Sequence, residues 1–431
     1  MCWAAAYAGI FCYIYINYLN VVYSAEDYSI NDRATVEFAI SLLLAIVPIA
    51  FYSFSRAVSQ VMASLIYSLY YVPSVLVIHY ALDRSYAEVF TLQASLAITM
   101  CGLFVASKYP KHTGESEPIP RFYRKSVFGL SILMLAAVVA TYRDHMRLVS
   151  LDEVYDLRFE NNEIEKSVLI GYFVMQLSYC FLPFALARAF LYKEKGNLLL
   201  GLAGCVVIYA STGARISIFT PFILGGFYAL MKWKGDLLRN ILLTVTVASA
   251  LVIILLPDNN ATLLLKSIFF VRVLAVSGWA TYKYYVYFST HPVTYLSQIG
   301  VVNDLTGRYP FGSHSLGEIF AEVPGQSMNA GFWASEGLAS FGIYGIYIAS
   351  ILLAILLVAL NQLTRKLDWA FAVLWMCGFA MAMLNLPLST LMLSAGGFLI
   401  LGLLIMFRVK PPALNHRPEH SEAEPEPPLQ T

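Results

Sequence analysis

Charged residues are scarce in this chain of 431 residues: aspartate, glutamate, lysine and arginine together make up 13%. Their share in soluble proteins is about 25%. Hydrophobic residues make up 59% of the chain, and apolar runs of about 17 to 25 residues recur from end to end. Backbone polar groups inside a bilayer must be satisfied within their own segment, so these runs predict helices. We therefore predict an all-α polytopic membrane protein and exclude a soluble domain with one anchor.

The sequence also lacks the markers of several soluble enzyme classes. It contains no Walker loop, no dinucleotide-binding glycine pattern, no HExxH and no GxSxG. Its six cysteines form no CxxC pair and lie in or beside apolar runs, so we interpret them as packing residues. We expect no metal site and no cofactor, and the net charge of +1 gives no indication of nucleic-acid binding.

The distribution of basic residues predicts the orientation in the membrane. The loop 107–125 holds five lysines and arginines, which places it in the cytoplasm by the positive-inside rule. Counting from this loop gives about twelve spans with both termini in the cytoplasm, at approximately residues 3–22, 34–54, 58–78, 89–106, 126–141, 167–192, the two arms of 198–231, 240–256, 336–360, 369–386 and 390–407. We expect residues 1–408 to form a single transmembrane bundle. Residues 409–431, with six prolines and four glutamates, predict a disordered cytoplasmic tail.

Two outer loops are enlarged, residues 142–166 and 257–335. The second begins with an apolar stretch, 261–280, that carries two basic residues. An extra crossing there would place the basic residues near 365 and 408 outside, so we interpret the stretch as a re-entrant or interface-lying helix. The aromatic residues that follow predict a belt at the membrane surface: Trp279, Tyr282, Tyr284, Tyr285 and Tyr287.

One charge, Arg215, lies in the middle of 34 otherwise uncharged residues, 198–231. Lysines flank this stretch on both sides, so we predict a hairpin that turns at residues 211–215 on the outer side. Each arm has roughly 17 residues and reaches some 25 Å, less than the hydrocarbon thickness of about 30 Å. An arginine placed there costs several kcal/mol without an anionic partner and indicates a functional site. A snorkelling arginine at a helix end is the alternative.

Further arginines lie in the outer loops, against the positive-inside bias. Arg147 and Arg158 lie in the first loop and Arg272 in the second. Because the planar guanidinium group binds phosphate through two hydrogen bonds, these arginines together with Arg215 predict a diphosphate site. Internal salt bridges are the alternative, since the first loop holds charges of both signs.

The second outer loop also contains the candidate acid–base residues. His314, Glu318 and Glu322 are spaced four residues apart and would share one face of a helix. Glu336 follows, ahead of the glycines at 342 and 345. Histidine accepts protons from hydroxyl groups near neutral pH, so we predict His314 as the base, with Glu318 or Glu336 as substitutes. A surface histidine without a role is the alternative.

This arrangement of spans and arginine-bearing outer loops resembles the O-antigen polymerase (Wzy) and oligosaccharide repeat-unit polymerase families, and more distantly the O-antigen ligases. The local matches are Tyr155-Asp156-Leu157-Arg158, Thr212-Gly213-Ala214-Arg215 and Phe341-Gly342-Ile343-Tyr344-Gly345. The spacing from the histidine to the glycine pair is longer here than in the ligase-like pattern.

The resemblance implies glycosyl transfer between two undecaprenyl-diphosphate-linked oligosaccharides at the periplasmic face of the bacterial inner membrane, which builds a surface polysaccharide. Arg215, helped by Arg158, Arg147 and Arg272, would stabilise the leaving diphosphate without a metal ion. The bilayer, a chain-length regulator and a flippase are the implied partners.

Two alternatives stay open. A polyprenyl-phosphate-sugar-dependent glycosyltransferase would use an acidic pair in the first outer loop, where Glu26 and Asp27 lie. A flippase for lipid-linked oligosaccharides would carry its charges along the spans, and the scarcity of charge there favours chemistry at the outer face.

Overall fold

The structure, a computed structural model, describes residues 1–110, 116–150, 154, 157, 167–257, 259–320 and 332–409. Within these residues the regular structure is helical and no strand occurs, which confirms the all-α class. Ten helical segments are long and apolar enough to cross a membrane: Cys2–Tyr23, Val58–Ala81, Tyr86–Ala106, Arg121–Tyr142, Val168–Tyr192, Lys195–Thr212, Leu237–Leu255, Thr262–Phe288, Ile343–Thr364 and Leu388–Met406. The count of twelve spans and the orientation stay predictions.

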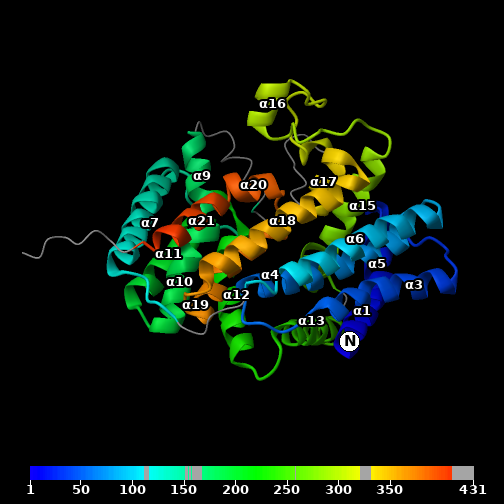
Figure 1. Ribbon diagram of the computed structural model, residues 1–431, viewed down its shortest axis with the longest axis horizontal. Helices are drawn as coiled ribbons and strands as arrows, with labels where there is room; N and C mark the ends of the chain where they lie inside the picture. The colour runs from blue at the N-terminus through cyan, green and yellow to red at the C-terminus, as the bar shows by residue number, and fades with distance from the viewer. Residues whose placement is uncertain are drawn as a thin grey trace, which may run out of the picture.

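Figure 1 shows the helices under the labels used from here on. In chain order they are α1 (Cys2–Ile14), η1 (Tyr15–Leu19), α2 (Asn20–Tyr23), η2 (Ser24–Glu26), α3 (Thr35–Ile46), η3 (Val47–Phe51), α4 (Val58–Ile66), η4 (Tyr67–Tyr71), α5 (Val72–Ala81), α6 (Tyr86–Ala106), α7 (Arg121–Tyr142), α9 (Val168–Gln176), η5 (Leu177–Phe181), α10 (Leu182–Tyr192), α11 (Lys195–Thr212), α12 (Arg215–Lys232) and α13 (Leu237–Leu255). They continue with α14 (Asn260–Lys266), η6 (Ser267–Ala275), α15 (Val276–Phe288), α16 (Gly300–Thr306), η7 (Glu318–Phe320), α17 (Ala334–Phe341), α18 (Ile343–Thr364), α19 (Trp369–Met383), α20 (Leu388–Leu393) and α21 (Gly397–Met406).

Several predicted spans differ from the helices observed. The predicted spans 34–54 and 369–386 correspond to the shorter apolar helices Thr35–Phe51 and Trp369–Met383. The predicted span 336–360 is wrong as one helix, because Gly342 separates α17 from α18. The predicted span 390–407 is likewise divided into α20 and α21.

The helices pack as two groups (Figure 1). In the first, α15 packs on α5, and α18 packs on α6 and α17; in the second, α10 packs on α11 and α19. Helix α4 contacts both α18 and α19 and so joins the two groups.

One end of the bundle carries the connections after α2, α5, α7, α11, α15 and α19, and we call it the long-loop face. Arg33 Nε donates to the carbonyl of His79 at 2.9 Å, which ties the first of these connections to the end of α5. At the opposite end, Lys366 pairs with Glu117 at 2.7 Å. The side chain of Asn361 bonds there to the carbonyl of Ser107 at 3.1 Å.

Pro73 is the second residue of α5, which directly follows the π-helical turn η4. Because proline has no N–H, it cannot bond to the carbonyl of Leu69 four residues earlier. That carbonyl instead accepts a hydrogen bond from Ser277 Oγ at 3.0 Å. The proline therefore creates the acceptor that attaches α15 to η4.

The stretch predicted as a re-entrant or interface-lying helix over 261–280 is part of a longer helix, Thr262–Phe288. The outer loop 257–335 stays a prediction over this range. Near the start of the helix, the Lys266 ammonium lies 5.9 Å from the ring of Tyr18, and near its end Tyr285 Oη lies 3.5 Å from Glu88. Both contacts are with elements that end or begin at the long-loop face. Whether this helix crosses the membrane stays a prediction.

Candidate functional site

Helices α17 and α18 form a tight hairpin at the long-loop face. Gly342 between them has a φ of +60°, a conformation that residues with a Cβ rarely adopt. A Cβ at Gly345 would lie 1.8 Å from the carbonyl oxygen of Gly337, so the two helices touch through their backbones. The two glycines of the segment 341–345 therefore allow α17 to fold back along α18.

The hairpin places the beginning of α17 inside the bundle. Trp333 is fully buried, and its Nε1 donates to Ser350 Oγ at 2.6 Å. Ser350 lies two helical turns, about 10 Å, along α18 from its first residue. The chain therefore enters the bundle before α17 and returns toward the long-loop face along it.

Glu336 on α17 is the buried carboxylate of this region, with 5% of its surface exposed. It accepts hydrogen bonds from the backbone N–H of Leu388, from Ser389 Oγ at 2.6 Å and from Gln298 Nε2 at 3.4 Å. Helix α17 lies outside the ten candidate spans. Burial raises the pKa of Glu336, because it penalises the charged form, and the bonds from Ser389 and Leu388 oppose the shift.

The carboxylate of Glu336 also caps α20. Leu388 is the first residue of α20, and the first N–H groups of a helix have no partner inside it. Helix α20 ends at Leu393, and Gly396, with a φ of +91°, precedes α21. Glu336 therefore holds the start of α20, the part of the candidate span Leu388–Met406 that precedes the interruption at Gly396.

The turn before α20 is recessed. Helix α19 has 15 residues and is about 22 Å long, shorter than the hydrocarbon thickness of about 30 Å. The turn 384–387 between α19 and α20 therefore lies below the membrane surface on the long-loop side if α19 begins at the opposite surface.

A second buried polar network adjoins Glu336. Tyr70 Oη lies 2.7 Å from Thr281 Oγ1 and 3.2 Å from Ser335 Oγ. It also donates to the carbonyl of Phe332 at 3.1 Å. These residues were not predicted, because single hydroxyl groups within apolar runs give no pattern in the sequence.

Residues 294–298 cover this region as a strap along α17. The backbone N–H of Thr294 donates to the carbonyl of Ala339 at 2.8 Å, and that of Tyr295 to Ser340 at 3.0 Å. Gln298 Nε2 donates to Ser340 Oγ at 3.1 Å. Gln298, which no sequence pattern indicates as a site residue, is thereby held over Glu336.

His314 and Glu318 lie in the loop beyond the strap, and these two residues do not share a helix. The chain turns at residues 310–317, and only a 3₁₀ turn follows at Glu318–Phe320. The backbone N–H of Ser315 donates to Glu318 Oε2 at 2.6 Å, and this bond, with a smaller effect of His314, lowers the pKa of Glu318. Both His314 and Glu318 are exposed. Glu322 lies outside the described residues.

Arg215 lies where the sequence predicts it, at the turn of the α11–α12 hairpin. Helix α11 ends at Thr212, Gly213 has a φ of +62°, and Arg215 is the first residue of α12. Arg215 is partly buried and Arg147 is exposed. The backbone N–H of Arg147 donates to the carbonyl of Ala210 at 3.2 Å. The two arginines therefore lie at the same end of the hairpin.

The other two predicted arginines are not brought to this turn. Arg158 lies outside the described residues. Arg272 lies on η6, which packs on η4, α5 and α15, whereas α12 packs on α10, α11, α13 and α19. Arg272 is exposed and lies within the candidate span Thr262–Phe288, on helices that do not pack on α12.

Helix α20 connects the neighbourhoods of Glu336 and Arg215. Ser217, two residues after Arg215, has its Oγ 3.2 Å from Ser178 Oγ on η5. On the other side of η5, Cys180 lies against Gly396, where a Cβ would approach it to 3.6 Å. The turn after α20, at Gly396, thus lies beside η5, and the beginning of α20 is held by Glu336. A helix of six residues is about 9 Å long.

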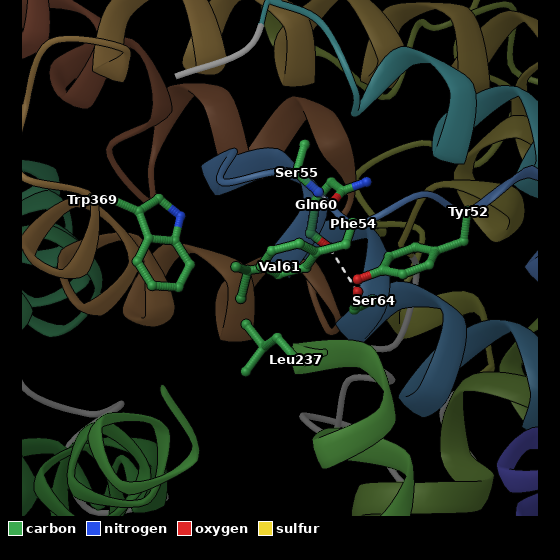
Figure 2. A pocket seen from close by; sticks show the side chains of 8 residues that line it. All are labelled: Tyr52, Phe54, Ser55, Gln60, Val61, Ser64, Leu237 and Trp369. Carbon is green, nitrogen blue, oxygen red and sulfur yellow. Dashed lines mark hydrogen bonds between the residues drawn. The ribbon is translucent and has the colours of Figure 1, made fainter. Parts of the chain in front are cut away.

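Other candidate groups have partners or lie elsewhere. Asp27 pairs with Lys283, and the side chain of Glu26 lies outside the described residues. The pocket of Figure 2 lies at the opposite end of the bundle, lined by residues that include Tyr52, Gln60 and Trp369. Its volume of about 10 Å³ holds about one water molecule. Among the described residues, no group of three histidine, cysteine or acidic side chains could hold a metal ion.

Comparison of the chain with protein-family models, with curated proteins and with solved structures finds no match. Conclusions about function therefore rest on the residues and on the geometry of this site.

Proposed function

We propose that the protein is a glycosyltransferase that joins undecaprenyl-diphosphate-linked oligosaccharides into a surface polysaccharide. The supporting observation is that α20 connects a buried carboxylate, Glu336, with an arginine turn at Arg215, at the same face of a membrane bundle. The reaction needs these two kinds of group. One stabilises the charge of the leaving diphosphate, and the other accepts the proton of the attacking hydroxyl.

The arginine turn receives the diphosphate of the donor. Arg215 is partly buried at a helix start and Arg147 is exposed beside it. As the bond from the sugar C1 to the diphosphate breaks, negative charge develops on the leaving oxygen. Guanidinium groups held in place stabilise that charge without reorganisation during the reaction.

Glu336 takes the proton of the acceptor hydroxyl as that oxygen bonds to C1. A general base works best when its pKa lies near the working pH, and burial shifts the pKa of Glu336 in that direction. His314, the first candidate from the sequence, is exposed on the loop. The geometry therefore favours Glu336 over His314 and Glu318 as the base.

The proposal assigns the long-loop face to the periplasm and the bundle to the bacterial inner membrane. A flippase must then deliver the lipid-linked units to this face, and a chain-length regulator would act on the product. Both are proposed as partners in the membrane.

A flippase is the second candidate, because interrupted helices such as α20–α21 occur at the binding sites of transporters. The interrupted helix itself, however, carries no cation over residues 388–406, so it offers no charge to a translocated diphosphate. Arg188 is neutralised by Glu194, whose Oε2 accepts a hydrogen bond from its Nε at 2.8 Å, and Lys266 and Arg272 lie in another candidate span, Thr262–Phe288. The glycosyltransferase alternative that uses Asp27 is opposed by the ion pair with Lys283.

The test is the substitution Arg215→Ala in cells whose own copy is deleted. We expect surface chains to shorten to single repeat units, with Arg215→Lys giving a partial recovery. Arg143→Ala is the matched control, because Arg143 lies on the same face and pairs with Asp144 at 3.1 Å in an exposed position. Long chains at wild-type levels in Arg215→Ala would contradict the diphosphate role. Accumulation of lipid-linked units on the cytoplasmic side would indicate a flippase.

A further inference from the structure

Helix α15 carries three rings on one face where it meets the long loop, Tyr284, Tyr287 and Phe288, spaced i, i+3 and i+4. His291 follows in the turn after the helix, where its backbone N–H donates to the carbonyl of Tyr287 at 3.1 Å and continues this face. Tyr284 and Phe288 are buried, Tyr287 is partly buried and His291 is exposed. The predicted membrane belt is wrong for Tyr284, which has 1% of its surface exposed.

The buried rings hold the long loop in place. Tyr284 stacks on Phe320 with the ring centres 4.5 Å apart, and Phe288 meets Phe311 at 6.0 Å. Such pairs stabilise by about 0.5–1.5 kcal/mol beyond the area they bury. These contacts account for Tyr284 and Phe288, but not for the rings that stay partly exposed beside them.

The partly exposed rings form what we call the aromatic shelf: Tyr287, His291, Tyr309 and Phe311. Tyr287 and His291 stack with their ring centres 3.9 Å apart and 6° between the planes. Tyr309 meets Phe311 at 5.7 Å. The shelf is thus a set of rings in fixed positions at the long-loop face.

Polar groups beside the shelf are also fixed. Tyr309 Oη donates to the carbonyl of His314 at 2.7 Å, and Glu318 is held by the N–H of Ser315 at 2.6 Å. His291 Nδ1 lies 3.0 Å from Thr290 Oγ1. Ionisable side chains are costly among lipid chains, so rings interleaved with His291, His314 and Glu318 do not fit an acyl surface.

A pyranose ring matches this combination of groups. One face of the sugar carries C–H groups, which pack on an aromatic ring, and its edge carries hydroxyls that need donors and acceptors. Sites for such ligands combine aromatic walls with a few polar groups whose positions are fixed. Rings and partners that are already in place lower the entropy cost of binding.

We propose that the aromatic shelf binds a pyranose ring of the acceptor oligosaccharide, stacked on the Tyr287–His291 pair. The assignment to the acceptor rests on the proposed function. The shelf and the reaction site are related through two packed helices, because α15, which carries Tyr287, packs on α17, which carries Glu336. A sugar on the shelf would therefore be held at the same face of the bundle as the carboxylate that takes the proton.

Binding is measured on the full chain in phosphatidylcholine nanodiscs by saturation-transfer NMR. The probe is the repeat-unit oligosaccharide released by mild acid from the lipid-linked pool of the producing cell. We expect binding to wild-type protein, and binding about fivefold to tenfold weaker in Tyr287→Leu, from the loss of one stacked ring. Tyr287→Phe keeps the ring and should bind as wild type does.

Two further variants separate binding from folding. His291→Ala removes an exposed side chain and should weaken binding by a similar factor without lowering the melting temperature. Tyr13→Leu, an exposed tyrosine on α1, is the matched control and should leave binding unchanged. The proposal is overturned by wild-type affinity in both Tyr287→Leu and His291→Ala, or by the absence of a signal from wild-type protein.

The same assay distinguishes this proposal from the proposed function. Arg215→Ala should lose long polysaccharide chains but keep binding of the probe, because the probe has no diphosphate. Shelf-dependent binding together with normal chains in Arg215→Ala would support the shelf and contradict the polymerase. Loss of long chains in Arg215→Ala, with no binding of the probe to wild-type protein, would support the polymerase and contradict the shelf.

Discussion

Replacing Glu336 separates its two roles, the cap of α20 and the proposed base. Glu336→Ala leaves the N–H of Leu388 and the hydroxyl of Ser389 without their acceptor. A buried group that loses its partner costs about 1–3 kcal/mol, so we expect destabilisation by roughly 3 kcal/mol. Glu336→Gln keeps one carbonyl acceptor, and the Ser389 hydroxyl can rotate to accept a bond from the new amide. We expect that change to cost about 1 kcal/mol.

Thermal unfolding in detergent, followed with a thiol-reactive dye, measures this difference. Cys180, Cys205 and Cys377 are buried and become reactive when the bundle opens. Glu336→Ala should melt well below wild type, and Glu336→Gln close to it. Both should fail to build long chains, because neither has a carboxylate. Glu117→Gln, which removes an exposed ion pair at the opposite face, is the control for both readouts.

The pH dependence gives an independent check on Glu336. Its pKa is raised by burial, so the folded state favours the protonated form. The resulting contribution to stability is full below the ordinary glutamate pKa and is lost as the pH rises through the raised value. Glu336→Gln should lack this loss. Normal chain length in Glu336→Gln would refute the reasoning, because the residue would then be only a cap.

Three further substitutions test the surroundings. Gly345→Ala places a Cβ 1.8 Å from the carbonyl oxygen of Gly337, so it should lower the melting temperature strongly, whereas Gly402→Ala, with no atom within 4 Å, should not. Asp27→Asn breaks a partly exposed ion pair worth about 0–1 kcal/mol. The surface polysaccharide chains should stay long. Short chains in a stable Asp27→Asn protein would favour the glycosyltransferase that uses the acidic pair. The pKa of Glu318 is lowered, so its bond to Ser315 is present above the ordinary glutamate pKa and is lost as the pH falls through the lowered value. Amide hydrogen exchange in residues 311–320 should therefore rise as the pH falls through that value. Glu318→Gln should remove this pH dependence of the exchange.

The sequence predicts the helices of this protein well, because the length of each apolar run is set by the bilayer. It also predicts the turn at Arg215, where Gly213 permits the left-handed conformation. The interruption at Gly342 was not predicted, since hydrophobicity continues on both sides of it. Hydropathy indicates which residues are buried in lipid or protein, but not where the chain reverses its direction.

The surroundings of Glu336 could not be predicted for a different reason. Its partners Gln298 and Ser389 are 38 and 53 residues away along the chain, and no local pattern relates them. Their contact depends on α17 folding back along α18. The sequence could therefore select Glu336 as an acid, but not show that it is buried and bonded.

The hydrogen bonds of Glu336 suggest how a capping residue can also act as a base. The bond from the Ser389 hydroxyl is 2.6 Å long, whereas that from Gln298 is 3.4 Å, near the limit at which such a contact still counts as a hydrogen bond. In the proposed function, an acceptor hydroxyl that replaces Gln298 would displace one of the longest contacts and leave the short bonds to the start of α20 intact. Because Gln298 belongs to the strap 294–298, its displacement would open the carboxylate toward the long-loop face. A sugar on the aromatic shelf, at the same face, would then meet Glu336 on the side of this long contact.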